Sequence, residues 1–136
     1  MSNFELQIEE QPPVRNPSRD AVMEALAQLH PKGPSFVVLT RDDGSYVQTA
    51  GARLRLTVEY RQMLAPGFRH YTLGKSPTDT RPTSINCRCG PIHCHMSESM
   101  TLSDAQAIFT EFHSSGRVPD GFVLRDRTSE HDTNPA

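Results

Sequence analysis

Two stretches of the chain carry hydrophobic residues at the spacing of an amphipathic helix. In the first stretch they recur at intervals of four and three residues, at Val22, Leu26 and Leu29. Residues at this spacing lie on one face of a helix. Asn16 is a favourable N-cap and Pro17 a favourable first residue, so we predict a helix from Pro17 to about His30.

The second helical stretch begins after Thr101. Thr101 and Asp104 have the spacing of a capping box, in which each side chain accepts a hydrogen bond from the other residue's backbone N–H. The hydrophobic positions that follow are Ala105, Ile108, Phe109 and Phe112. They form the stripe that such a helix buries. Gly116 is suited to end the helix, because glycine readily adopts a left-handed backbone.

Seven shorter segments have the pattern of β-strands. They are residues 4–8, 36–39, 45–50, 53–61, 68–73, 84–89 and 92–96. Asp43-Gly44, Pro66-Gly67 and Gly90-Pro91 separate neighbouring segments. These dipeptides favour tight turns between antiparallel strands.

The clearest alternation lies in residues 53–61. The hydrophobic side chains on one side are Leu54, Leu56, Val58 and Tyr60. The polar side chains on the other are Arg53, Arg55, Thr57, Glu59 and Arg61. We predict a half-buried strand with a charged outer face.

Strands grouped between two helices predict an α+β fold, with a mostly antiparallel sheet of about five to seven strands and two helices packed on one face. A length of 136 residues is typical of one domain. We therefore predict a single domain over residues 1–136, with an ordered core from about 2 to 127. Residues 128–136 are polar and lack periodicity, so we expect a loose tail.

The charge balance argues against a nucleic-acid partner. Lysine and arginine total 14 against 16 aspartate and glutamate residues, a formal net charge of −2. No overall positive field would gather phosphates. The first residues lack the basic start and apolar core of a signal peptide, and no apolar run is long enough for a membrane span. We expect a cytoplasmic protein without membrane contact.

Residues 87–95 concentrate side chains that bind metals, namely Cys87, Cys89, His93, Cys94 and His95. Structural zinc sites usually take two pairs of ligands that are well separated along the chain. Strand alternation instead places the cysteines with hydrophobic neighbours and the histidines on the opposite face. We therefore predict core cysteines and no metal or cofactor. The alternatives are a small zinc-binding protein or metal-dependent enzyme using this cluster, and a redox sensor.

No catalytic constellation is present in the sequence. A phosphate-binding glycine-rich loop, a G-x-S-x-G motif and the zinc-deaminase pattern are all missing. A cysteine nucleophile would need His93 or His95 as a base on its own face. We predict that the protein is not an enzyme and has no catalytic residues.

Several segments occur in an order that is typical of one group of proteins. The run FVVLTRDDGSYVQTAG is followed by LTVEYR, FRHYTLG, GPI and SESMTLSDAQAIFTEFHSSGRVPDGFVLRD. Over about residues 22–126 the chain resembles small bacterial immunity proteins, the antitoxins encoded beside secreted polymorphic toxins. The resemblance implies a protein that occludes a toxin's active site or a surface near it. It does not include the Cys/His segment.

The expected partner is therefore a cognate protein toxin, with nucleases and deaminases as the typical toxin activities. A charged sheet face that no helix covers can recognise such a partner electrostatically. The residues assigned to this contact are Arg53, Arg55, Glu59, Arg61, Arg88, His93 and His95. Because many such toxins are basic, Glu59 and Glu98 are the acidic contacts expected. The identity of the toxin and the oligomeric state do not follow from the sequence.

Overall fold

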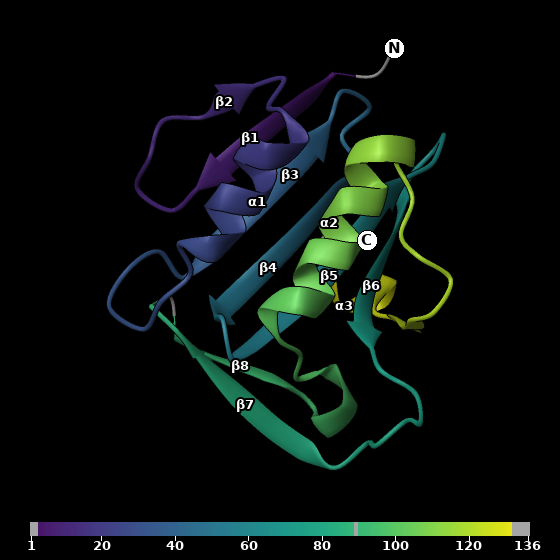
Figure 1. Ribbon diagram of the computed structural model, residues 1–136. Helices are drawn as coiled ribbons and strands as arrows, with labels where there is room; N and C mark the ends of the chain where they lie inside the picture. The colour runs from purple at the N-terminus through teal and green to yellow at the C-terminus, as the bar shows by residue number, and fades with distance from the viewer. Residues whose placement is uncertain (1–2, 89, 132–136) are drawn as a thin grey trace.

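Antiparallel pairing of neighbouring strands builds a seven-stranded sheet in the order β2-β1-β3-β4-β5-β6-β9 (Figure 1). The computed structural model describes residues 3–88 and 90–131. The strands are β1 (Phe4–Ile8), β2 (Val14–Arg15), β3 (Phe36–Arg41), β4 (Tyr46–Ala52), β5 (Arg55–Met63), β6 (Phe68–Gly74) and β9 (Val123–Asp126). The turns predicted at Asp43-Gly44 and Pro66-Gly67 connect β3 to β4 and β5 to β6.

Two helices, α1 (Arg19–Ala27) and α2 (Leu102–Ser115), cover one face of this sheet (Figure 1). Their hydrophobic stripes meet the inward side chains of the strands in one hydrophobic core. Phe109 and Phe112 of α2 are its largest fully buried side chains. The predicted α+β fold, with two helices on one face of a mostly antiparallel sheet, is confirmed. No helix among the described residues is long and apolar enough to cross a membrane.

The start of α1 differs from the prediction. Ser18, not Asn16, is the N-cap, and its hydroxyl accepts a hydrogen bond from the backbone N–H of Ala21 at 3.1 Å. Asn16 lies in a left-handed conformation at φ 49°, and its side chain accepts a hydrogen bond from the N–H of Phe4. Asn16 therefore holds the segment before α1 to β1, and the helix begins at Arg19, two residues after the predicted start at Pro17.

The hairpin between β4 and β5 corrects the prediction for residues 53–61. Strand β4 continues through Gly51 to Ala52, which pairs with Arg55. Arg53 and Leu54 form the two-residue turn, and Leu54 is 84% exposed, so its predicted inward orientation is wrong. The alternation holds from Arg55 onward, where Leu56, Val58 and Tyr60 are buried.

A separate two-stranded sheet, β7 (Pro82–Cys87) with β8 (Gly90–His95), lies at one end of the large sheet (Figure 1). Strand β7 packs against the ends of β4 and β5, and the short 3-10 helix η1 (Met96–Glu98) leads from β8 towards α2. Strands β2 and β9 and the short helix α3 (Thr128–His131) were not predicted. Residues 128–131, expected to be a loose tail, are thus helical, and residues 132–136 lie outside the described part of the chain.

Candidate functional site

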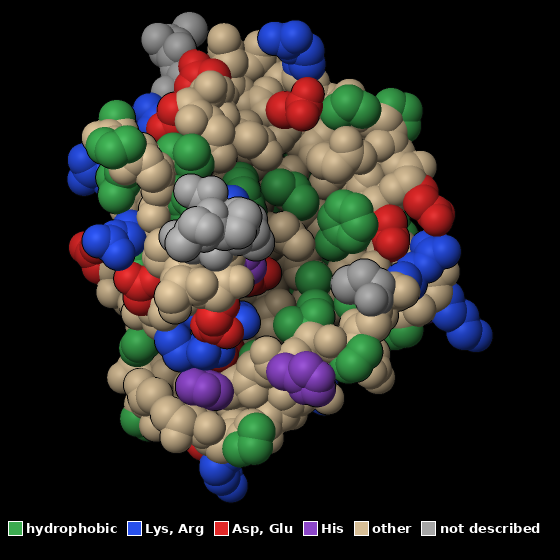
Figure 2. Space-filling model, turned by 180° about the vertical axis from the view of Figure 1, so that it is seen from behind, with side chains coloured by type: hydrophobic (Ala, Val, Ile, Leu, Met, Phe, Trp, Pro, Cys, Tyr) green, Lys and Arg blue, Asp and Glu red, His purple; other side chains and the backbone are tan. Residues whose placement is uncertain are grey.

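The face of the sheet opposite α1 and α2, here called the outer face, is the side seen in Figure 2. Cross-strand pairing brings polar side chains from adjacent strands together on it. Gln48 pairs with Glu59, which pairs with Thr72, and Thr72 pairs with Arg125. The space-filling view shows hydrophobic side chains within a hollow on this face and charged side chains around it (Figure 2).

A hydrogen bond between Glu59 and His70 lies at the centre of the outer face. Glu59 Oε1 and His70 Nε2 are 3.0 Å apart, and His70 is only 1% exposed. Arg61 Nε donates a hydrogen bond to His70 Nδ1 at 3.1 Å. Because a guanidinium can only donate, His70 Nδ1 carries no proton, and the Nε2–H of a neutral imidazole donates to Glu59.

Arg61 is held between aromatic rings as well as by His70. Its guanidinium carbon lies 4.1 Å from the centroid of the Phe68 ring and 5.4 Å from that of Tyr46. Both distances are within the range of cation–π attraction. Arg61 is half-buried and forms no ion pair with any carboxylate in the described part of the chain. Its charge is therefore fixed in position without being neutralised.

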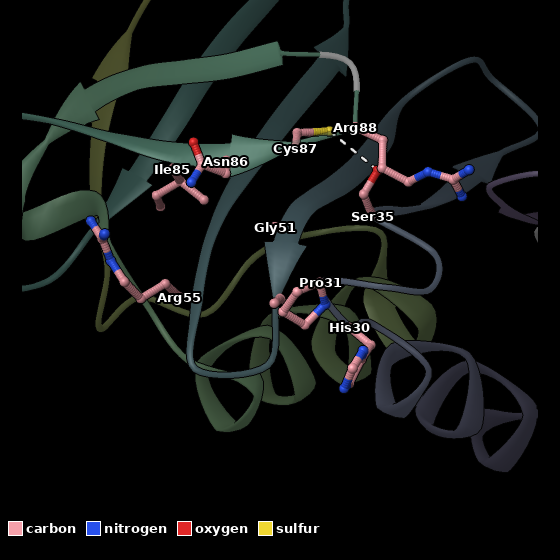
Figure 3. Close-up of a pocket in the computed structure, with 10 residues that line it drawn as sticks. His30, Pro31, Ser35, Gly51, Arg55, Ile85, Asn86, Cys87 and Arg88 are labelled. Carbon is pink, nitrogen blue, oxygen red and sulfur yellow. Dashed lines mark hydrogen bonds between the residues drawn. The ribbon is translucent and has the colours of Figure 1, made fainter.

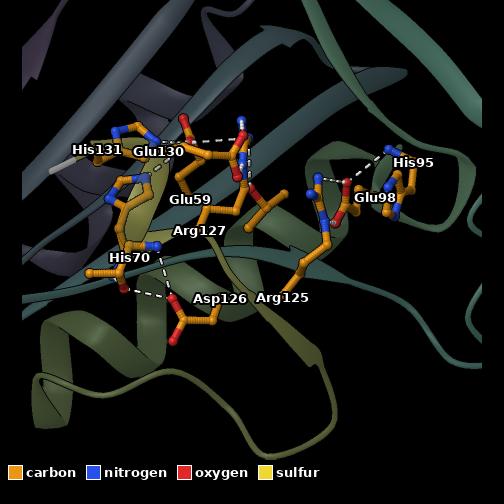
Figure 4. Close-up of polar contacts among 11 residues, drawn as sticks. Glu59, His70, His95, Glu98, Arg125, Asp126, Arg127, Glu130 and His131 are labelled. Atoms are coloured by element: carbon orange, nitrogen blue, oxygen red, sulfur yellow. Dashed lines mark hydrogen bonds and ion pairs between the residues drawn. The ribbon is translucent and has the colours of Figure 1, made fainter.

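The C-terminal segment folds back onto this network (Figure 4). The His131 ring of α3 lies 3.8 Å from the His70 ring, centroid to centroid, and His131 Nε2 is 3.9 Å from Glu59 Oε1. Arg127 reaches Thr72 Oγ1 at 3.2 Å and Glu59 at 4.0 Å. The backbone N–H of Arg127 also donates to the His70 carbonyl at 2.7 Å.

The surroundings lower the pKa of two of these groups, Glu59 and His131. Burial acts to raise the pKa of Glu59, but the hydrogen bond from His70 and the positive charge of Arg127 outweigh it and lower that pKa. Burial is the largest of the causes that lower the pKa of His131. The two shifts favour an ionised Glu59 beside a neutral His131.

A second buried ion pair anchors η1 to the outer face (Figure 4). Glu98, which is 3% exposed, accepts hydrogen bonds from Arg125 Nε at 2.7 Å and Nη2 at 2.8 Å, and from the backbone N–H of His95 at 2.8 Å. Burial acts to raise the pKa of Glu98, but the hydrogen bonds from Arg125 and His95 lower it. Glu98 is thus a structural carboxylate, and its burial and pairing leave it little surface for the partner contact that the sequence suggested.

Glu59, His70 and His131 could in principle hold a metal ion, since one ligand atom of each lies within 4.8 Å of the others. The hydrogen bonds of His70 argue against metal binding by this group. A metal on His70 Nε2 would move the proton to Nδ1, where Arg61 Nε already donates. Arg127 adds a positive charge 4.0 Å from Glu59. As arranged, the three side chains fit a hydrogen-bonded network better than a metal site.

The Cys/His segment does not converge on one point among the described residues. Cys87 pairs with Gly90, whereas Cys94 pairs with Thr83, so about 13 Å of strand separates the two cysteines. Ile85 and Cys94 are buried while Asn86 and His93 are exposed, which confirms the predicted alternation there.

Cys89 lies outside the described residues. Burial is the main cause that raises the pKa of the Cys94 thiol, as expected of a core cysteine.

A pocket of about 300 Å³ opens beside β7 (Figure 3). It is lined by His30, Pro31, Ser35, Gly51, Ala52, Arg55, Ile85, Asn86, Cys87 and Arg88. Ser35 Oγ lies 3.3 Å from Cys87 Sγ and donates to Glu9 at 2.9 Å. The side chains of Arg55, Arg88 and His30 point away from one another (Figure 3). The charged groups therefore do not form a convergent binding site.

The residues predicted to bind a partner fall into three places. Arg55, Glu59 and Arg61 share the outer face of β5, as the alternation indicated. Arg53 lies in the β4–β5 turn, and Arg88 follows β7 and pairs with Glu9 and Glu10. The two histidines, His93 and His95, belong to β8, outside the large sheet.

Sequence reasoning missed four functional candidates, namely His70, Arg125, Arg127 and His131. The turn at Pro66-Gly67 sets the register of β5 with β6, and that register places His70 opposite Arg61. His70 could therefore have been found by extending the alternation across the turn. The other three come from β9, α3 and the residue between them, and no clear pattern predicted those elements.

Comparison of the chain with profiles of protein families, with curated proteins and with solved structures gave no match.

Proposed function

We propose that the protein is an immunity protein, which binds a cognate secreted bacterial toxin in the cytoplasm and neutralises it by contact through the outer face. The composition of that face carries the proposal. Its partly exposed side chains include Phe36, Val38, Tyr46, Arg61 and Phe68. Aromatic residues and arginine are enriched in protein–protein interfaces, and lysine is depleted. The two lysines of the chain, Lys32 and Lys75, lie outside the strands of the sheet.

The arrangement of the polar groups supports contact with a partner over catalysis. Glu59 and His70, the pair nearest to an acid–base arrangement, are bonded to each other, and His70 is 1% exposed. A general base must lie within hydrogen-bond reach of the proton that it removes. His70 has no such access while α3 covers it. A rigid, pre-arranged face suits docking, because little side-chain freedom is lost on binding.

Co-expression tests this proposal. The protein encoded by the neighbouring gene is expressed in a host with and without this chain, and growth is measured. The proposal predicts that the neighbouring product is toxic alone and that co-expression restores growth. Toxicity without rescue, or a neighbouring product that is harmless, would reject it.

A matched pair of variants then locates the contact. Arg61→Glu lies on the outer face and Arg19→Glu lies exposed on α1, on the opposite side of the molecule. Rescue is expected to be lost in the first variant and kept in the second. Loss in both, or in Arg19→Glu alone, would place the contact elsewhere.

A further inference from the structure

Some arginines near the outer face form an ion pair with a carboxylate, and others do not. The arginines of β5, β9 and the residues after β9 are Arg55, Arg61, Arg125 and Arg127, and the carboxylates near them are Glu59, Glu98 and Glu130. Arg125 is paired with Glu98 and Arg127 with Glu130. Glu59 accepts from His70. Of these four arginines, Arg55 and Arg61 form no ion pair with a carboxylate of the described residues.

Arg55 and Arg61 differ in how many of their guanidinium nitrogens are still free to donate to a partner. Arg55 donates to Ser99, to Thr83 and to the Ser84 carbonyl, at 3.1 to 3.4 Å. Its guanidinium therefore serves to hold the β7–β8 hairpin to β5. Arg61 uses only Nε, on His70, and its Nη1 and Nη2 donate to no other described residue. The two terminal nitrogens of a guanidinium match the two oxygens of a carboxylate.

We infer that the Arg61 guanidinium binds an acidic side chain, aspartate or glutamate, of the partner protein. The proposed function underlies this inference and supplies the partner. Phe68 and Tyr46 orient the guanidinium, and His70 fixes its inner edge, so its outer edge is presented to the partner before binding. A carboxylate there would give the Arg61 guanidinium an acceptor, as Glu98 does for Arg125 and Glu130 does for Arg127.

A single carboxylate suits the Arg61 guanidinium better than the phosphate backbone of a nucleic acid does. Nucleic acids bind through many cationic contacts, and their affinity grows with each phosphate that is neutralised. Here Glu59 and Glu130 lie in the same network, and the whole chain has a net charge of −2. A single guanidinium that lies close to these carboxylates suits one acidic side chain.

The first test uses probes that need no knowledge of the partner. The full chain is labelled with nitrogen-15, and signals of β5 and β6 are followed by NMR as deca-glutamate, deca-lysine or single-stranded dT10 is added. Deca-glutamate is expected to shift the Arg61 side-chain signal and its neighbours saturably. Arg61→Gln should abolish the shift, and Arg19→Gln should leave it intact. No shift at Arg61, or an equal shift in Arg61→Gln, would overturn the inference, and preferential binding of dT10 would reassign the face to nucleic acid.

The second test uses the toxin once co-expression has identified it. Truncation of one partner of a buried charge pair weakens binding by about 30-fold or more. Arg61→Gln is expected to show such a loss, and Arg61→Lys to recover only part of it, because lysine keeps the charge but loses the planar fork. Arg61→Glu should be rescued by replacing the contacting toxin carboxylate with arginine.

The two proposals fail in different ways. If wild-type protein neutralises the toxin and Arg61→Gln binds equally well, the acidic contact is wrong and the proposed function stands. If wild-type protein does not neutralise the neighbouring product, the proposed function is wrong, while the peptide titration still reports on Arg61. A native melting curve for each variant separates lost contact from lost folding.

Discussion

The imidazole rings of His70 and His131 lie 3.8 Å apart between centroids and are tilted by 31°, although one belongs to β6 and the other to the last described helix. This contact is the inner end of a small network that also contains Glu59, Arg61 and Arg127. Because α3 has no buried residue, it is held to the sheet by this network and by the bonds that the His70 backbone forms with Arg127 and Thr128. The stability and the pH response of this segment should therefore follow from these side chains.

Removing the carboxylate of Glu59 should destabilise the whole sheet. Glu59→Ala leaves His70 Nε2–H buried without its acceptor, which costs about 1–3 kcal/mol of the free energy of unfolding. Urea denaturation followed by circular dichroism measures the change. Glu5→Ala is the matched control, since Glu5 is exposed on the outer face of β1, and it should change stability by less than about 0.5 kcal/mol. Equal effects in the two variants would contradict the role given to Glu59.

Acidification should release α3. The pKa of His131 is lowered, chiefly by burial and then by His70, so docking favours the neutral ring. The contribution of docking is present above the ordinary histidine pKa of 6.5 and is lost as the pH falls through the lowered value. Titration of the histidine ring protons by NMR should show His131 ionising below 6.5, together with loss of the Arg127 and Thr128 amide shifts typical of docking.

A variant separates this release from general acid unfolding. His131→Phe keeps an aromatic ring against His70 and cannot be protonated, so α3 should stay docked to a lower pH than in the wild type. Ionisation of His131 at or above 6.5, or an unchanged release in His131→Phe, would show that another group controls the segment.

Loss of Glu98 should be more damaging than loss of an exposed acid. Glu98→Ala leaves Arg125 without its bidentate partner in a mostly buried site. Breaking such a pair typically costs about 3–5 kcal/mol, and thermal denaturation should reveal a large drop in Tm. Glu24→Ala, at an exposed position on α1, should leave the Tm nearly unchanged. A Glu98→Ala protein with wild-type Tm would mean that η1 is not anchored by this pair.

Gly51 permits the close approach of β4 to the start of β5. A Cβ at this position would lie 2.5 Å from the Arg55 carbonyl oxygen and 2.9 Å from Leu56 Cα, and φ is +125°. Gly51→Ala should lower the free energy of unfolding by roughly 2–4 kcal/mol, from strain and overpacking combined. Gly67→Ala has φ +93° but open space around it, so only about 1–2 kcal/mol is expected. Denaturant titration of both variants checks the difference.

The sequence predicted those parts of the fold that rest on local chemistry. The capping box at Thr101 and Asp104 and the left-handed Gly116 were confirmed, because each depends on residues within one turn of a helix. Leu54 was placed wrongly because alternation gives parity along a strand but not the residue at which the strand begins. The hairpin turn took Arg53 and Leu54 out of the ladder.

The candidate site was predicted only in part, because half of it comes from segments without a periodic pattern. Glu59 and Arg61 were identified from the alternation of β5 alone. His131 and Arg127 reach them only through the antiparallel pairing of β9 with β6, and a strand of four residues with two exposed hydrophobic side chains, Val123 and Leu124, gives little signal. Long-range pairing of this kind depends on the whole sheet.

Hydroxyl-radical footprinting of the complex with the toxin tests directly whether the toxin docks on the outer face. Met63 is 37% exposed and lies on the outer face, in line with Glu59 and Arg61, whereas Met23 lies on α1 on the other side. Docking through the outer face should slow oxidation of Met63 several-fold on toxin binding and leave the oxidation rate of Met23 unchanged. Protection of Met23 with continued oxidation of Met63 would show that the helical face meets the toxin, and would contradict docking through the outer face.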